Sequence, residues 1–206
     1  MTNFSFRTIA GPAEGQYKQK GSRFLAFAYP VETQEEIRSR RSDLKKKYFD
    51  ARHHCFAWTL GADKHMFRVN DDGEPGHSAG DPILGQIRSR DLTNVLVVVV
   101  RYFGGTKLGV GGLISAYKLA AANALDNAVI VDKDLKKTVI ISYDYSATAE
   151  ITRLIKEFDL VIESQSFDEA CVLTARCRLV NAESLFKKLK IMKSLGSIKE
   201  AREATA

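Results

Sequence analysis

The pattern of apolar positions predicts a mixed structure in the first two thirds of the chain. Residues 95–100 are six consecutive apolar residues, which is typical of a strand buried on both faces. Ile37, Leu44 and Tyr48 recur at seven- and four-residue spacing and predict a helix over residues 33–49. The Ala- and Leu-rich residues 113–128 predict a second helix. Further expected elements are an extended segment at 23–31, strands at 53–60 and 65–70, and a short helix at 82–88.

The pattern starts again, on a smaller scale, after residues 131–134. Residues 138–145 alternate as a strand, and residues 149–158 have helical spacing. The remaining expected elements are strands at 160–166 and 170–179 joined by a turn at Phe167, Asp168 and Glu169, a helix at 182–193 and a strand at 197–199. The order β-α-β-β-α-β is that of the split ferredoxin-like motif. The sequence therefore predicts the α+β class, with domains at residues 1–132 and 133–206.

The composition indicates an ordinary soluble globular chain. Of 206 residues, 45% are hydrophobic and 27% are charged. No apolar run approaches the roughly 20 residues that span a bilayer, and the first residues lack the pattern of a secretory signal. The three cysteines, Cys55, Cys171 and Cys177, predict free thiols in a reducing compartment. We therefore expect a cytoplasmic protein without a membrane partner.

Positive charge is concentrated in one segment. The formal net charge is +6, and residues 38–52 alone carry seven basic residues against Asp43 and Asp50. The basic residues are Arg38, Arg40, Arg41, Lys45, Lys46, Lys47 and Arg52. They cover the exposed arc of the predicted helix at 33–49, where like charges repel one another. This arc is either a solvated face or a surface that contacts a polyanion such as RNA.

A glycine-rich segment joins the buried strand to the helix at 113–128. It contains Gly104, Gly105, Gly109, Gly111 and Gly112 within nine residues. A buried strand, a glycine-rich turn and a helix start together present backbone amides to an anion, and Lys107 adds a charge. An anion nest requires a positive φ for at least one of these glycines. Neither GxxxxGK[ST] nor GxGxxG fits the spacing, so the sequence predicts an anion site but no particular nucleotide. Alternatively, the glycines only let the helix pack close to the sheet.

Candidate side chains for chemistry lie in two blocks. The first holds His53, His54 and Cys55, and the second holds Asp71, Asp72, Glu74, His77 and Ser78. A metal site would combine His53 and Cys55 with His77 or a carboxylate, but no ligand spacing such as CxxC is present, so we predict no metal. The carboxylates of the second block could hold Mg²⁺ through water or act as acid and base. Otherwise they stabilise a turn, and its small residues form a second wall of the anion cleft.

Neither block supports a nucleophile. Ser78 lies beside His77, and Cys55 lies beside His53 and His54, but no triad motif such as GxSxG accompanies them. We therefore predict no catalytic residue, and an enzymatic role is less favoured than binding.

Two structural details follow from local chemistry. Asp81 and Pro82 predict an N-cap and the first position of the helix at 82–88. Arg101 ends the buried strand, where a guanidinium needs a partner, and Asp71, Asp72 and Glu74 are the acids nearest to it in the expected cleft.

Four motifs, in this order and spacing, resemble the YigZ/IMPACT family. They are KGSRF at 20–24, ARHHCFAW at 51–58, DDGEPGHSAG at 71–80 and RYFGGTKLGVGGLISAY at 101–117. Val110 and Ser78 stand where the family usually has Thr, and the missing hydroxyl at Val110 argues against a side-chain contact to phosphate there. The resemblance covers essentially the whole chain. It implies an N-terminal domain like the second domain of ribosomal protein S5 and a ferredoxin-like C-terminal domain like the last domain of translocating elongation factors.

The same resemblance implies a translation context. Eukaryotic relatives act in translational stress control by binding a ribosome-associated regulator of an initiation-factor kinase, through an additional N-terminal domain. This chain starts too late to contain that domain, so we do not expect that partner to carry over, although another protein partner in translation control is compatible with the resemblance.

Two functions of different class follow. The first is a protein that binds RNA or the ribosome through Arg38, Arg41, Lys45, Lys46, Lys47 and Lys107. The alternative is a small-molecule enzyme that handles a phosphorylated or nucleotide ligand at the glycine-rich loop, because the S5-like fold is shared with small-molecule kinases. No cofactor is expected for the first function, binding to RNA or the ribosome.

Overall fold

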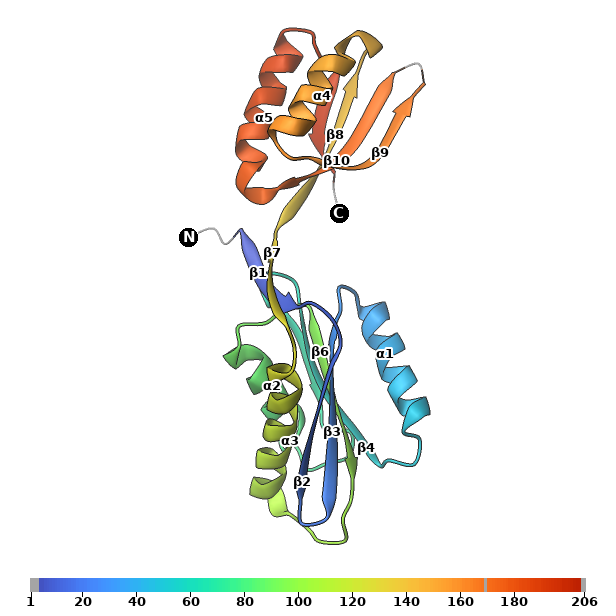
Figure 1. Ribbon diagram of the computed structural model, residues 1–206, viewed down its shortest axis with the longest axis vertical. Coiled ribbons are helices and arrows are strands. Elements are labelled where there is room, and N and C mark those ends of the chain that lie inside the picture. Colours follow the sequence, from blue (N-terminus) through green and yellow to red (C-terminus); the bar gives the residue numbers. More distant parts are fainter. Residues whose placement is uncertain (1–3, 169, 205–206) are drawn as a thin grey trace. The chain divides into compact units, whose positions relative to one another are not determined.

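A computed structural model describes residues 4–168 and 170–204 of the chain (Figure 1). The chain divides into two compact units: one is Phe6–Lys133, and the other combines the chain from Asp134 onward with the N-terminal residues up to Ser5. Glu169, part of the predicted turn at 167–169, lies outside the described residues. None of the helices in the described ranges is long and apolar enough to cross a membrane.

The first unit is built on a five-stranded antiparallel sheet with the order β2-β3-β6-β4-β5. The strands are β2 (Ala13–Gln19), β3 (Ser22–Pro30), β4 (His53–Leu60), β5 (Met66–Asn70) and β6 (Val95–Tyr102). The predicted buried strand is confirmed as the central strand β6, in which every side chain from Val95 to Val100 is at most 1% exposed. Val97 and Val99 pack on one face of the sheet, and Val98 and Val100 pack on the other.

Helices cover both faces of this sheet. Helices α2 (Gly80–Ser89) and α3 (Gly109–Asp126) enclose one core, and α1 (Gln34–Lys47) covers the opposite face through Ile37 and Leu44 (Figure 1). Helix α3 packs tightly on the edge strand β2, because a Cβ on Gly15 would overlap the backbone of Asn123 and Ala124. Because α1 and α3 pack on the sheet that contains β6, the ends of these three elements all belong to the same unit.

Several boundaries differ from those predicted. Helix α3 begins at Gly109, four residues earlier than expected, so Gly109, Gly111 and Gly112 belong to its first turn. Strand β2 was not predicted, and neither was the two-stranded ribbon of β1 (Ser5–Ile9) and β7 (Ile130–Asp134). These segments are short or largely polar, so their pairing depends on partners that are distant in sequence.

The second unit has the predicted ferredoxin-like fold. Its elements are β8 (Lys136–Tyr143), a 3₁₀ turn (Tyr145–Ala147), α4 (Thr148–Glu157), β9 (Val161–Phe167), β10 (Cys171–Arg178), α5 (Leu179–Ser194) and β11 (Glu200–Glu203). The antiparallel sheet has the order β11-β8-β10-β9, and both helices contribute to one core. The last strand, predicted at 197–199, forms at Glu200–Glu203 instead. The α+β class is thereby confirmed.

Candidate nucleic-acid interface

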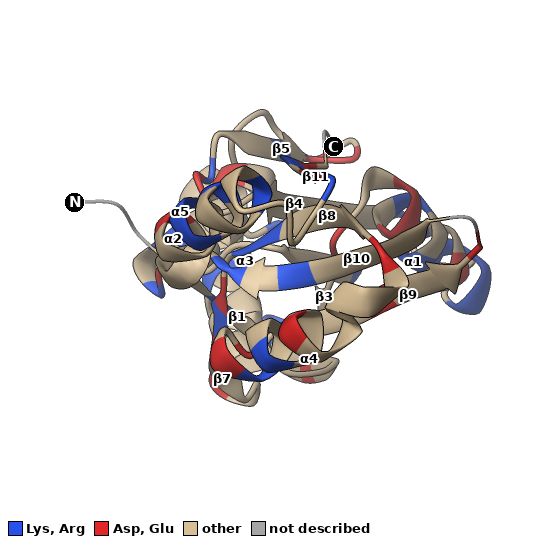
Figure 2. Ribbon diagram, turned by 90° about the horizontal axis from the view of Figure 1, so that it is seen from above, with Lys and Arg blue, Asp and Glu red and all other residues tan. Residues whose placement is uncertain are grey.

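Helix α1 carries its charges in an order that stabilises the helix. Thr33 accepts a hydrogen bond from the Glu36 amide at 3.2 Å, acidic residues occupy the first turn, and Lys45, Lys46 and Lys47 occupy the last. Cations near a helix C-terminus interact favourably with its dipole. Part of the basic character of α1, visible as blue segments in Figure 2, is therefore explained by the helix itself.

The basic side chains of α1 fall into two groups. Three of them pack on aromatic rings: Arg41 lies 3.7 Å from the Phe56 centroid, and Arg40 and Lys47 lie over tyrosine rings at 5.3 and 5.2 Å. Desolvation, followed by the charge of Arg68, lowers the pKa of Arg41. The contacts of Arg40 with Tyr29 and of Arg41 with Phe56 attach the helix to the sheet, whereas Tyr48 is the C-cap of α1 and Lys47 is exposed. Arg41 is therefore less available to a partner than its sequence position suggests.

The other group, together with Arg41, lines an open hollow of about 510 Å³ on α1. Arg38, Lys45 and Lys46 are exposed there, and the hollow also includes Phe49, whose side chain is 83% exposed. Arg38 lies 3.5 Å from Glu35, and Lys45 lies 3.8 Å from Asp72. Such exposed contacts contribute little energy and are readily exchanged for phosphate.

Different glycines of the glycine-rich loop agree with different interpretations, the anion site for some and close packing for others. Gly105 and Gly109 have φ of +86° and +72°, which confirms that at least one of these glycines adopts a positive φ. Gly104 is a packing position, because its amide donates to Ser22 Oγ at 3.1 Å and a Cβ there would overlap the backbone of Gly21. Gly111 has neither constraint. The start of α3 is exposed, and the N-cap residue Leu108 offers no side-chain hydrogen bond to its amides.

Arg101 has the acidic partner that its burial required. Its Nη1 donates to Glu74 Oε1 at 2.6 Å, and the two side chains are only 7% and 4% exposed. The Tyr117 hydroxyl donates to the same Glu74 oxygen at 2.7 Å, and the Cys55 thiol lies 3.3 Å from the Tyr117 oxygen. Burial raises the pKa of both Cys55 and Tyr117. Both groups are therefore neutral near pH 7, and Cys55 is not a thiolate nucleophile.

A cavity of about 310 Å³ adjoins this buried pair. Arg101, Glu74 and Lys107 contribute charge to its lining, and Phe103 and the first turn of α3 contribute apolar walls. The full lining is Glu74, Pro75, Arg101, Phe103, Lys107, Leu108, Gly109, Val110 and Leu113. The structure thus brings together the end of β6, the glycine-rich loop, and Glu74 and Pro75 of the acidic turn.

Asp71, another acid of the turn, forms hydrogen bonds with backbone amides. Asp71 accepts hydrogen bonds from the amides of His77, Ala79 and Gly80 at 3.0, 2.9 and 2.8 Å, so it caps the start of α2. The prediction that Asp81 is this cap is wrong: Asp81 lies in the first turn of α2 and contacts His77 Nδ1 at 2.5 Å.

The remaining candidate residues from the turn and from β4 also form hydrogen bonds with nearby residues. Asp72 accepts from the His54 amide at 2.7 Å, and its carbonyl oxygen lies 2.8 Å from His53 Nδ1. Ser78 is fully buried and donates to the Pro75 carbonyl at 2.6 Å. Neither Ser78 nor the histidines line the Arg101 cavity. Across residues 4–168 and 170–204, no group of three His, Cys, Asp or Glu side chains has the arrangement of a metal site.

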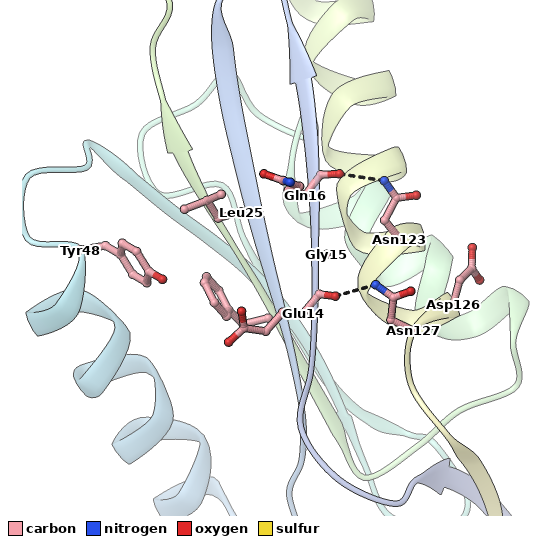
Figure 3. Close-up of a pocket in the computed structure, with 9 residues that line it drawn as sticks. Glu14, Gly15, Gln16, Leu25, Tyr48, Asn123, Asp126 and Asn127 are labelled. Carbon is pink, nitrogen blue, oxygen red and sulfur yellow. Dashed lines mark hydrogen bonds between the residues drawn. The ribbon is translucent and has the colours of Figure 1, made fainter.

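Two features were missed from the sequence. Phe103 is 52% exposed beside the Arg101 cavity, a position that the adjoining Arg-Tyr-Phe run could have suggested. A second hollow, of about 580 Å³, is lined by residues of β2, β3 and α3 and by Tyr48 (Figure 3). Beside it, Asn123 and Asn127 donate to the carbonyls of Gln16 and Glu14, each at 2.8 Å. These amides occupy the outward carbonyls of an edge strand, which protects the edge from pairing with another chain. No local pattern could reveal contacts across more than a hundred residues.

Comparison with known proteins agrees with the motifs. The model of the Impact N-terminal domain matches residues 20–125. The IMPACT family member YvyE of Bacillus subtilis is 33% identical over 165 residues, which are 80% of this chain and 76% of YvyE. The IMPACT family member YigZ of Escherichia coli is 32% identical over 152 residues, 73% of this chain and 74% of YigZ. A crystal structure of a hypothetical protein covers 99% of both chains at 28% identity and a TM-score of 0.77. The chain therefore belongs to the IMPACT family, as its four motifs predicted.

Proposed function

We propose that this chain is a non-enzymatic protein that binds nucleic acid or the ribosome and takes part in the regulation of translation. The observation that carries the proposal is the hollow on α1, where Arg38, Lys45 and Lys46 are exposed around the side chain of Phe49. Clustered cations release condensed counterions when they meet phosphates, which drives association with nucleic acid. Membership of the IMPACT family supplies the translation context, because that is the context in which its eukaryotic members act.

Binding to structured RNA and to purified ribosomes over a range of salt concentrations tests this proposal. If Arg38, Lys45, Lys46 and Lys107 each neutralise one phosphate, the logarithm of the binding constant falls against the logarithm of salt with a slope of about −4 on duplex RNA. Replacing Arg38, Lys45 and Lys46 together by Gln should reduce that slope to about −1.

A matched control carries the same charge change elsewhere. Arg153, Lys190 and Lys193 are exposed on the helices of the second unit, and their replacement by Gln should leave the slope nearly unchanged. Absence of binding at low salt, or equal losses in the two triple variants, would contradict the proposal.

The cavity beside Arg101 and Lys107 favours a second candidate, a small-molecule enzyme with a phosphorylated or nucleotide ligand. Calorimetry with ATP, GTP and inorganic phosphate distinguishes the two candidates. Saturable heat with a nucleotide, abolished by Lys107→Ala, would support the enzyme, whereas RNA binding without such heat supports the first proposal.

A further inference from the structure

We propose that the nucleic acid bound by this chain is single-stranded, and that it follows a track around one end of the first unit, from α1 to the start of α3. This inference rests on the proposed function and specifies its ligand. The bases stack on Phe49 and Phe103, and a backbone phosphate lies at the first turn of α3 beside Lys107.

The track runs along three hollows. The first, on α1, ends at Phe49. The second has a volume of about 230 Å³ and includes Asp50 and Arg52, which follow Phe49 in the chain, together with Arg101 and Phe103. The third is the cavity of about 310 Å³ at the start of α3, and Arg101 and Phe103 line it as well. Shared lining residues therefore connect the second and third hollows, and the chain itself connects the first and second.

Exposed aromatic rings alternate with cations along this path. Phe49 and Phe103 are 83% and 52% exposed, and Arg52 and Lys107 are exposed close to them in the chain. Base stacking on aromatic side chains combined with a basic groove is typical of single-strand binding. In a duplex the base faces are covered by neighbouring bases, so these rings favour a strand whose bases are unstacked.

The acid within the track does not oppose this path strongly. Asp50 accepts a hydrogen bond from the Tyr102 hydroxyl at 2.7 Å, which fixes the position of its carboxylate. Exposed Arg52 lies in the same hollow and contributes the opposite charge.

The start of α3 provides the phosphate position. Its amides have no side-chain cap from Leu108, and a helix N-terminus favours an anion. Independently, the guanidinium of Arg101, buried and paired through Nη1 with Glu74, lines the same cavity, and its buried Nε has no hydrogen-bond partner among the described residues. The positive charges of Arg101 and Lys107 and the negative charge of Glu74 leave a net charge of +1, which matches the single negative charge of a phosphodiester.

The experiment uses fluorescence anisotropy with a labelled 12-nucleotide uridine strand, a 12-base-pair RNA duplex, and a strand of the same length whose nucleotides lack bases. The wild-type protein should prefer the uridine strand to both other probes. Phe49→Ala and Phe103→Ala should each weaken binding of the uridine strand by about tenfold. They should change binding of the baseless strand little, because it offers phosphate without a stacking surface.

Matched controls separate stacking and charge from general effects. Phe167 is a 56% exposed phenylalanine of the second unit, and Phe167→Ala should leave binding unchanged. Lys107→Ala should reduce the salt slope on the uridine strand by about 0.7, whereas replacement of the exposed Lys118, farther along α3, should not. Phe103→Leu keeps an apolar side chain but removes the aromatic face, so it should also weaken binding. It replaces Phe103→Ala in the test if the alanine variant has a lowered melting temperature.

The outcomes distinguish this inference from the function on which it rests. Equal binding of strand and duplex, with no effect of Phe49 or Phe103, would overturn the track, while sensitivity to the α1 triple variant would preserve the proposed function. Absence of binding to every RNA probe and to ribosomes would overturn both.

Discussion

At the scale of single residues, the buried pair of Arg101 and Glu74 has the clearest consequence for stability. Because both side chains are almost fully buried, removal of either one leaves an uncompensated charge in the interior. Arg101→Met should reduce the free energy of unfolding by about 3–5 kcal/mol, measured by denaturant titration. The double variant Arg101→Met with Glu74→Gln should recover part of this loss. Exposed Arg153→Met is the control, and a loss below about 1 kcal/mol for Arg101→Met would contradict the prediction.

Two glycines of one loop should respond oppositely to alanine. In Gly104→Ala the new Cβ meets the backbone of Gly21 and Ser22, so the free energy of unfolding should fall by about 2 kcal/mol or more. Gly111 lies in the first turn of α3, and a methyl group there would meet no neighbouring atom within 4 Å, so Gly111→Ala should raise it by about 0.5 kcal/mol. Thermal unfolding of both variants gives the comparison. Equal shifts of the melting temperature would show that Gly104 and Gly111 do not differ in this way.

Two histidines should titrate on opposite sides of their ordinary pKa of 6.5. Desolvation lowers the pKa of buried His54, outweighing the charge of Asp72, whereas the hydrogen bond to Asp81 raises the pKa of exposed His77. The stability contributed by neutral His54 is present above pH 6.5 and is lost as the pH falls through its lower folded-state pKa. The imidazole proton signals of the two residues, followed by NMR against pH, should show the midpoint of His54 below that of His77. The reverse order would contradict the assignment.

At the scale of elements, the start of α2 depends on Asp71, an acid of the preceding turn that lies outside the helix. Asp71 accepts hydrogen bonds from three amides around that start, while Asp81 contacts the side chain of His77. Asp71→Ala should therefore lower the free energy of unfolding by about 1–2 kcal/mol, as the loss of a helix cap does. Asp81→Ala should change it by less than about 0.5 kcal/mol. Urea titrations of both variants test this, and a larger effect at Asp81 would restore the cap that local sequence suggested.

Elements with a strong apolar period could be predicted, and weakly patterned ones could not. The α1 helix and strand β6 each present a pattern that has one reasonable explanation, and both formed where expected. The start of α3 was placed too late because Gly109 and Gly111 are poor helix formers locally. Tertiary packing of α3 against β2 and α2 overrides that preference.

At the scale of the whole molecule, the second unit has a core of its own. Val139, Leu173 and Leu185 lie in a cluster made only of residues from that unit. Residues 134–206 expressed alone should therefore fold cooperatively, because a ferredoxin-like sheet covered by two helices buries its apolar face internally. Far-ultraviolet circular dichroism and a sigmoidal thermal transition provide the measurement, with the full-length chain as reference. A gradual, non-cooperative transition would show that this unit depends on the first.

The sequence by itself determined the α+β class, the buried central strand, the ferredoxin-like order and the family, because these depend on local periodicity and contiguous motifs. It also required an acid beside Arg101, since a buried guanidinium needs one. Only the tertiary structure decided that this acid is Glu74, that Asp71 caps α2, and that Phe49 and Phe103 lie along adjoining hollows. Those choices depend on side-chain positions across strands and turns that are far apart in the chain, and no spacing along a single segment encodes them.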